Sequence, residues 1–440
     1  MRVVSLALVL AACSSSSSTT DATNDGGAGD SAGHPDGNAR ADSASRADGG
    51  SVGDAGHDAP TSPAADAAHD ASGNLDALVE GSTDARGDAS SLSDASEMGA
   101  PDGGSVTCNG TPCYAGQSCV SGACQLTSCV GSHVPGDYAT ITSAMTALAG
   151  AGGGTICVAP GVFEEEAAVQ GSGGSGTIIV QGAGRGQTIL KSALLDVPFV
   201  NYELAGLTVH SVLIQSSGND SGGVPMTVSL VDTTVDGMGS TNGAAIAANA
   251  VGGPLTLTLD GVDLSATGTQ PGLVAALGGS FDEEQELTLT VVNSYIHGAA
   301  TGFSLTGEIY YTATATFENN TFESNGTGVL DSLLDGTGES STLVFFNNLV
   351  VNNMLGISSS DASTFGYNCL YGNTTNYAGS AVSGMGTVES NPLLDTESPP
   401  ALGPGSPCRA VGDPTHAPSH DFYGRHRSTS IDIGAVQSSP

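Results

Sequence analysis

The distribution of apolar and polar residues changes sharply at about Val130. Beyond this point, short β-rich runs are separated by Gly, Asn and Asp, and no helical periodicity exceeds about ten residues. Residues 256–259 and 287–291 alternate apolar and polar side chains, which is typical of strands with one buried and one solvated face. The pattern predicts an all-β domain.

A polar-polar-x-apolar phrase recurs through this domain. Its apolar residue falls at Val209, Val235, Leu264, Ile296, Phe322, Val350 and Leu370, with separations of 26, 29, 32, 26, 28 and 20 residues. Repeats of this length predict a single-stranded parallel β-helix whose turns stack ~4.8 Å apart. A β-sandwich is the alternative, but the long irregular repeats and the scarcity of hairpin turn signals count against it.

Stacked turns align equivalent residues in columns. The seven apolar anchors are expected to form one inward column. The polar residues just before them are expected to stack as an amide ladder at a bend, where Asn also tolerates a left-handed backbone. These polar residues are Asp232, Asn293, Asn319, Asn320, Asn347, Asn348 and Asn368.

The N-terminus indicates export. Residues 1–12 contain Arg2, a short apolar run and Ala11-Ala12 before Cys13. This arrangement resembles a bacterial lipoprotein signal peptide, which implies cleavage before Cys13 and lipidation of that cysteine. Ser14 follows the cysteine at the position where lipoproteins retained in the inner membrane often have Asp, so we expect transport to the outer membrane. An ordinary secretory signal followed by an incidental cysteine is the alternative.

Residues 13–106 consist largely of Ser, Asp, Ala, Gly and Thr. Such a segment cannot bury enough apolar area to offset the entropy of ordering, so we predict a disordered acidic tether. Residues 107–130 then contain Cys108, Cys113, Cys119, Cys124 and Cys129. In an exported chain this spacing predicts a small disulfide-rich module rather than a zinc site.

The alternating spacing favours the pairs Cys108–Cys119 and Cys113–Cys124, although the sequence leaves the connectivity open. Eight cysteines remain when Cys13 is set aside. We therefore expect Cys129 to pair with Cys157, and Cys369 with Cys408.

Both ends of the predicted β-helix, residues 131–437, resemble known families. Residues 137–145 and 154–165 resemble the opening of pectin-lyase-like proteins, which implies a right-handed β-helix that begins with a short capping helix. Residues 391–394, 405–408, 421–427 and 431–435 are similar to the end of bacterial choice-of-anchor Q surface proteins. One departure is Val436-Gln437, where that family has Tyr-Glu.

The charge excludes some functions. Lys and Arg total 9 against 45 Asp and Glu, for a net charge of −36, so we expect no nucleic-acid partner. The resemblance to pectin-lyase-like proteins implies that the catalytic residues of polysaccharide lyases or hydrolases could be present. The basic residue of pectate lyases is absent between Lys191 and Arg409, and the polygalacturonase and pectin methylesterase sets are absent too.

The residues after the anchors supply the remaining candidate chemistry. His210 should lie near Asp236, and His297 near Glu323, as possible acid–base pairs. Solvated surface polarity is the alternative interpretation, because this column should face outward.

Other candidates lie in loops. Asp282, Glu283, Glu284 and Glu286 offer the oxygen ligands that calcium prefers, although contiguous carboxylates are typical of solvated loops. The group Arg425-His426-Arg427, near Asp421 and Asp432, is interpreted as ion pairs that close the last turn.

Three functions are compatible with these features. The first is a lipid-anchored outer-membrane or cell-surface protein whose non-catalytic β-helix binds a glycan or a surface protein. Tyr310 and Tyr311 are candidate sugar platforms, although the chain contains no Trp. The second is a carbohydrate-active enzyme with a non-standard site, and the third is a purely structural surface protein. No cofactor is required, although calcium is compatible with the first two.

Overall fold

The computed structural model describes a β-helix domain and parts of the module before it. Described are residues 129–438 except 172, 217–223, 279–284, 308–310, 333–339 and 361–362, and the backbone of 107–108, 111–112, 117–120 and 123–126. Cys13 and the predicted tether lie outside these residues. No helix among the described residues is long and apolar enough to cross a membrane.

Two short hairpins precede the β-helix. Strand β1 (Thr107–Cys108) pairs antiparallel with β2 (Thr111–Pro112), and β3 (Gln117–Val120) pairs in the same way with β4 (Ala123–Leu126). The side chains of Cys108, Cys113, Cys119 and Cys124 lie outside the described residues. Their pairing therefore stays a prediction.

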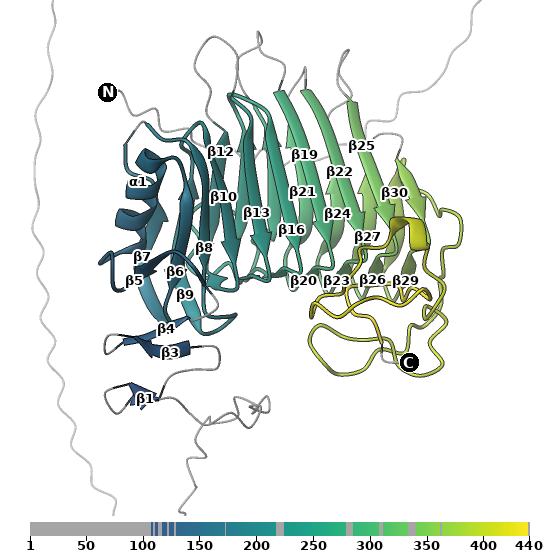
Figure 1. The fold of residues 1–440 in the computed structure, drawn as a ribbon. Coiled ribbons are helices and arrows are strands. Elements are labelled where there is room, and N and C mark those ends of the chain that lie inside the picture. Colours follow the sequence, from purple (N-terminus) through teal and green to yellow (C-terminus); the bar gives the residue numbers. More distant parts are fainter. Residues whose placement is uncertain are drawn as a thin grey trace, which may run out of the picture. The chain divides into compact units, whose positions relative to one another are not determined.

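Helix α1 (Ile141–Ala151) packs against the first turn of the β-helix (Figure 1). Thr140 caps its N-terminus through a capping box with Ser143. The Glu165 carboxylate accepts hydrogen bonds from the backbone N–H groups of Ile141 and Thr142, at 2.8 and 3.1 Å. The buried side of the helix covers the end of the apolar core, so the expected capping helix is confirmed.

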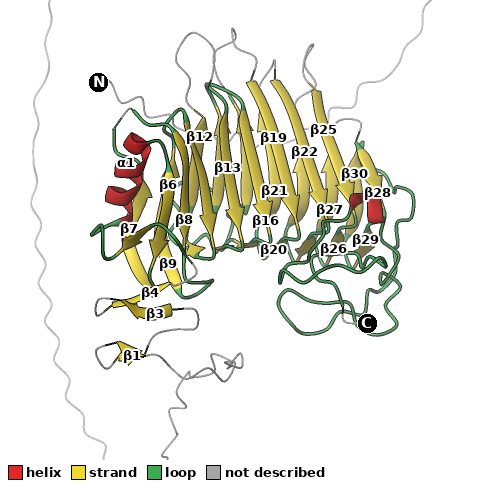
Figure 2. Cartoon of the chain, in the orientation of Figure 1, coloured by secondary structure: helices red, strands yellow, loops and turns green. Residues whose placement is uncertain are grey.

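The β-helix consists of three columns of parallel strands, which we name faces A, B and C (Figure 2). Face A contains β5 (Ser132–Val134), β6 (Gly154–Val158), β8 (Gly176–Gln181), β10 (Val200–Ala205), β13 (Met226–Val231), β16 (Leu255–Asp260), β19 (Gln285–Val292), β22 (Tyr311–Glu318), β25 (Ser340–Phe346) and β28 (Thr364–Gly366). Face B contains β11 (Thr208–Val209), β14 (Thr234–Val235), β17 (Asp263–Ser265), β20 (Tyr295–His297), β23 (Thr321–Glu323), β26 (Leu349–Val351) and β29 (Cys369–Tyr371).

Face C contains β12 (Val212–Ser216), β15 (Ile246–Ala250), β18 (Leu273–Leu277), β21 (Thr301–Gly307), β24 (Thr327–Asp331), β27 (Leu355–Ser359) and β30 (Thr375–Gly379). Strand β9 (Thr188–Leu195) pairs with the first strands of both faces B and C, and β7 (Gly161–Ala168) pairs with β9. The predicted parallel β-helix is confirmed.

The predicted anchors lie in one column of face B. Each pairs in register with the next, from Val209 opposite Val235 to Val350 opposite Leu370. All seven are at most 2% exposed. Burial of each such side chain stabilises the fold by roughly 1.5–3 kcal/mol, so the predicted inward column is also an energetic core.

The bend between faces A and B contains two adjacent columns of polar residues, whereas the sequence predicted a single amide ladder. Asn293, Asn319 and Asn347 adopt left-handed φ values of 52°, 56° and 57°. The ladder belongs to the following position: the Asn348 side-chain Oδ1 accepts from Asn320 N at 2.9 Å, and its Nδ2 donates to Phe317 O at 2.8 Å. The amide prediction is therefore correct for Asn320, Asn348 and Asn368, and of the left-handed residues Asn347 Nδ2 also donates to Asn319 Oδ1, at 3.4 Å.

A second amide ladder, which the sequence reasoning missed, lies between faces B and C. Asn325 N donates to Asn353 Oδ1, and Asn353 N donates to Asn373 Oδ1, both at 2.9 Å. These residues follow β23, β26 and β29, two residues after each strand ends. The two ladders satisfy buried backbone groups at both bends of the later turns.

Residues 380–438, which we name the C-terminal segment, fold back along the A–B bend. Asn319 Nδ2 donates to the backbone oxygens of Asp432 and Gly434 at 2.9 and 3.2 Å. Asn347 Nδ2 donates to Asp413 O and His416 O, each at 2.9 Å. The left-handed residues thus point outward and hold this segment.

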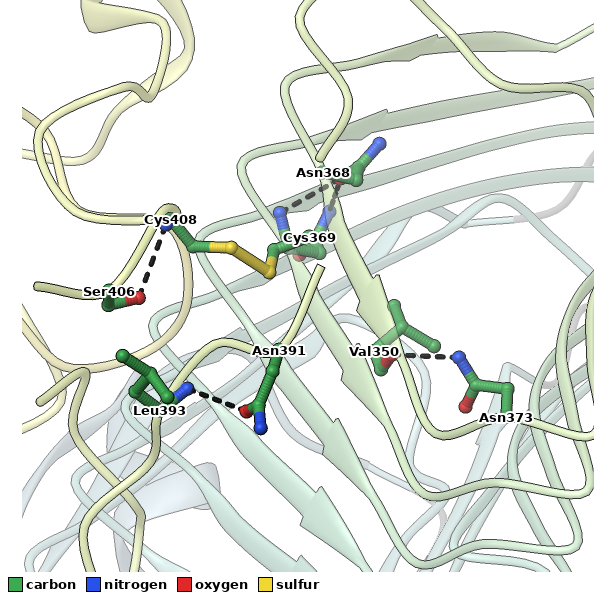
Figure 3. Close-up of a disulfide and its surroundings, with 9 residues drawn as sticks. Val350, Asn368, Cys369, Asn373, Asn391, Leu393, Ser406 and Cys408 are labelled. Atoms are coloured by element: carbon green, nitrogen blue, oxygen red, sulfur yellow. Dashed lines mark hydrogen bonds between the residues drawn. A yellow bond between two sulfur atoms is a disulfide. The ribbon is translucent and has the colours of Figure 1, made fainter. Parts of the chain in front are cut away.

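Two disulfides tie the ends of the β-helix. Cys129 is bonded to Cys157, and Cys369 on β29 is bonded to Cys408 in the C-terminal segment (Figure 3). Both predicted pairs are confirmed. The second one holds the C-terminal segment at the last turn, from which it returns toward earlier turns.

Candidate functional site

The outward residues after the anchors form a continuous column on face B. The register places Ser265, His297 and Glu323 on successive turns. Asp236 and His210 occupy the same position on the two turns before Ser265. The backbone N–H of His210 donates to Leu190 O, which places Lys191 at this position one turn earlier still. Lys191 was absent from the predicted column because its turn lacks the polar-polar phrase.

His210 and Asp236 form the predicted pair. His210 Nδ1 lies 2.9 and 3.0 Å from the two carboxylate oxygens of Asp236. The backbone N–H of Met238 donates to Asp236 Oδ1 at 3.0 Å, which holds the carboxylate in place. The two side chains are 25% and 24% exposed. With the proton on Nδ1, the tautomer that the carboxylate favours, Nε2 is an acceptor.

A surface hollow of about 540 Å³ surrounds this imidazole. Neighbouring turns contribute residues to this hollow. For example, Glu166 on β7 is the register partner of Ser192 on β9. The lining residues are Glu166, Lys191, Ser192, His210, Ser211, Met238, Gly239, Thr241 and Asn242. The hollow therefore combines an ammonium, a carboxylate, an imidazole and several hydroxyl or amide groups.

Lys191 is the single lysine of the chain. It is exposed and forms no ion pair with any residue in the described part of the chain. Since an ammonium offers three hydrogen-bond donors and no acceptor, Lys191 can bind hydroxyl or anionic oxygens in the hollow.

The second predicted pair is different in the structure. His297 and Glu323 are register partners, but His297 Nε2 lies 3.1 Å from Asp263 Oδ1, one turn earlier. Glu323 instead accepts a hydrogen bond of 2.7 Å from the Tyr295 hydroxyl. The Tyr295 and His297 rings stack at 4.1 Å. His297 and Glu323 therefore lie on neighbouring turns as predicted, but the hydrogen-bond partner of His297 is Asp263.

These groups satisfy one another. Burial, followed by the hydrogen bond to Glu323, raises the pKa of the Tyr295 hydroxyl. A hydroxyl with a raised pKa that already donates to a carboxylate is poorly suited to act as a base. We interpret this cluster as structural.

The remaining candidates are only partly described. Asp282, Glu283, Glu284 and Tyr310 lie outside the described residues. Glu286 is exposed on β19, and for Tyr311 on β22 the backbone alone is described. Within the described ranges, no group of three or more His, Cys, Asp or Glu side chains could hold a metal ion. The calcium site stays a prediction.

The basic group near the C-terminus lies along the A–B bend rather than closing the last turn. Arg425 Nε and Nη2 donate to Asp421 Oδ2 at 3.0 and 2.7 Å. Arg427 Nη2 donates to Asn293 Oδ1 at 3.0 Å and to two backbone oxygens of its own segment. The predicted ion pairing is present for Arg425, but its location was wrong, because Asn293 at the bend is a partner of Arg427.

Comparisons with known proteins add little beyond these observations. No family model matches the chain, and no curated protein matches it. Among solved structures, the mannuronan C-5 epimerase AlgE4 A-module of Azotobacter vinelandii is similar over 60% of this chain and 95% of that chain, with 14% sequence identity and a TM-score of 0.30. The resemblances to lipoproteins and to choice-of-anchor Q proteins stay predictions.

Proposed function

We propose that this protein is an exported lipoprotein that displays a non-catalytic β-helix at the outer membrane or cell surface and binds a glycan in the Lys191–His210 hollow. Cys13 carries the lipid, and residues 14–106 form the tether. The observation that supports glycan binding is the hollow of about 540 Å³, whose lining donors and acceptors come from neighbouring turns.

The lining chemistry suits sugar hydroxyls. Ser192, Thr241 and Asn242 offer neutral donors and acceptors, while Lys191 and Glu166 offer charged ones. The Met238 side chain is 56% exposed and supplies an apolar surface beside them. Sugar rings present both hydroxyl groups and apolar C–H faces, so this mixture matches them.

Retention on a panel of immobilised polysaccharides tests this function. We expect the purified protein to be retained by at least one glycan and Lys191→Gln to weaken retention. His297→Gln, which lies on a later turn of face B and outside the hollow, serves as the control. Equal retention of the wild type and Lys191→Gln would remove the hollow as the binding site.

A carbohydrate-active enzyme is the second candidate, and the His210–Asp236 pair favours it. A carboxylate that orients Nδ1 leaves Nε2 available as a general base or acid. Incubation with the same polysaccharides, with and without calcium, separates the two candidates. Shortened or unsaturated products that disappear in His210→Ala would replace the binding function by catalysis.

The anchor has a separate test. We expect radiolabelled palmitate to be incorporated into the full-length protein in its bacterial host and Cys13→Ser to abolish the label. Labelling of the Cys13→Ser variant would contradict a lipobox at this position.

A further inference from the structure

Basic side chains are rare in the β-helix and are unevenly placed. After Val130 they are Arg185, Lys191, Arg409, Arg425 and Arg427. Three of these five belong to the C-terminal segment, in a protein with a net charge of −36. Arg427 is half-buried and donates hydrogen bonds to Asn293 and to backbone oxygens, whereas Arg409 and Arg425 line a common hollow.

This second hollow, which we name the arginine hollow, has a volume of about 540 Å³. Its walls come from two stretches of the C-terminal segment, residues 409–410 and residues 425–438. His426, Ser428, Ser430 and Asp432 lie on the wall together with the two arginines. None of these residues belongs to the Lys191–His210 hollow.

A buried carboxylate lies beside each guanidinium group. Asp421 has a fully buried side chain and accepts from Arg425 Nε and Nη2. Asp432 is 3% exposed and lies 4.0 Å from Arg409 Nε. The backbone N–H groups of Ala410 and Ser438 also donate to Asp432, at 2.8 Å each. Both carboxylates therefore already have donors, and Asp421 orients Arg425.

Two further donors belong to residues that line the hollow. Arg425 Nη1 forms no hydrogen bond with any described residue, and the same holds for His426 Nε2. Guanidinium groups bind phosphate and sulfate oxygens in fixed forked geometry. Donors from several directions suit an ion with three or four peripheral oxygens better than a planar carboxylate with two.

We propose that the arginine hollow binds a tetrahedral oxyanion, either a free phosphate or sulfate ion or the same group as an ester on a glycan. Arg409, Arg425 and His426 donate to its oxygens, and the hydroxyls of Ser428 and Ser430 line its edge. This site is independent of the proposed function of the Lys191–His210 hollow.

Calorimetric titration of the full chain with inorganic phosphate, inorganic sulfate and acetate tests the proposal. We expect saturable binding of phosphate or sulfate, much weaker binding of acetate, and about tenfold weaker binding in Arg409→Gln, which corresponds to ~1.4 kcal/mol. His297→Gln, which lies in neither hollow, is the matched control for His426→Gln and should bind like the wild type. His426→Gln provides a second variant if Arg409→Gln lowers the melting temperature.

The outcomes separate clearly. Absence of saturable binding, or equal binding by wild type, Arg409→Gln and His426→Gln, overturns the site, and equal affinity for acetate overturns the tetrahedral specificity. A sulfated oligosaccharide titrated in parallel identifies the source. Tighter binding than inorganic sulfate indicates a glycan ester, and equal binding indicates the free ion; both results support the oxyanion site.

Discussion

His210 and His297 occupy equivalent positions on face B, each directly after an inward anchor and each beside a carboxylate. His210 lines a hollow of about 540 Å³, whereas His297 is stacked on Tyr295. Tyr295 itself is 6% exposed and packs with Phe422, Ala435 and Val436 of the C-terminal segment. The same repeat position therefore belongs to a candidate binding site at His210, on an early turn, and to a structural cluster at His297, on a later turn.

The outward residues of face B follow this division. Thr234 and Asp263 on the earlier turns are polar, whereas Leu349 and Cys369 on the later turns are apolar and at most 1% exposed. Leu349 and Cys369 pack with Ile433 in a small second core. A parallel strand that is apolar on both faces is buried on both faces, so coverage by another segment explains the change.

The largest expected effect on stability comes from the aromatic core of the later turns. Phe322→Ala should lower the free energy of unfolding by about 3–5 kcal/mol, because it leaves a cavity among Phe317 and Phe345. Val235→Ala, in the same column, should cost roughly 2 kcal/mol. Denaturant unfolding measures both, and equal losses would contradict the larger cavity expected at Phe322.

The amide ladder gives the next effect. Asn348→Ala leaves the buried N–H of Asn320 without its acceptor, which should cost about 1–3 kcal/mol. Thr233→Ala is the comparison on an earlier turn, where the hydroxyl donates to Leu204 O and Val231 O. Its cost should be near 1 kcal/mol. A smaller loss in Asn348→Ala than in Thr233→Ala would show that the ladder stabilises little.

Arg427 tests how the C-terminal segment is held. Arg427→Met removes the hydrogen bonds to Asn293 and to the backbone oxygens of Gly434 and Ala435. We expect the segment to become protease-sensitive at neutral pH while the β-helix resists digestion. After non-reducing electrophoresis the cut fragment should remain attached through Cys369–Cys408. Wild-type resistance in Arg427→Met would assign docking to the other contacts.

The same segment should respond to acid. Burial alone would raise the pKa of Asp421, but hydrogen bonds from Arg425 and from the backbone of Gln437 and Arg425 hold that pKa below its ordinary value. The ionised carboxylate thus stabilises the folded segment above the unfolded pKa of about 3.9. This stabilisation is lost as the pH falls through the lower, folded pKa.

Proteolysis with an acid-active protease across this range measures the loss. We expect the wild-type segment to open below the ordinary aspartate pKa. Asp421→Asn should be weakly docked at neutral pH already and should lack this group's contribution to the acid transition. Identical acid transitions in both proteins would contradict a role for Asp421.

His210 should have the smallest effect on stability. His210→Gln removes a partly exposed pair, so the free energy of unfolding should change by no more than about 0.5–1 kcal/mol. Glycan retention should nevertheless fall. His297→Gln is the matched control, with retention expected to be unchanged. A loss of retention in His297→Gln alone would move the site to the later turns.

The sequence by itself determined the repeat. Val209 to Leu370 are apolar at intervals of about one turn, and the stacking of parallel strands requires equivalent residues to align, so register and inward column follow from local pattern. The disulfide partners at the two ends were predictable because few unpaired cysteines remained. Asn residues before the anchors also indicated the bend.

Only the tertiary structure decided which side chains meet across the surface. His297 has carboxylates on both neighbouring turns, and its imidazole pairs with Asp263 and stacks on the Tyr295 ring. The path of the C-terminal segment depends on contacts more than 100 residues apart, such as Asn319 with Asp432. The direction of a side chain and the path of a distant segment leave no periodic signal in the sequence. The two hollows could therefore be found only in the folded structure.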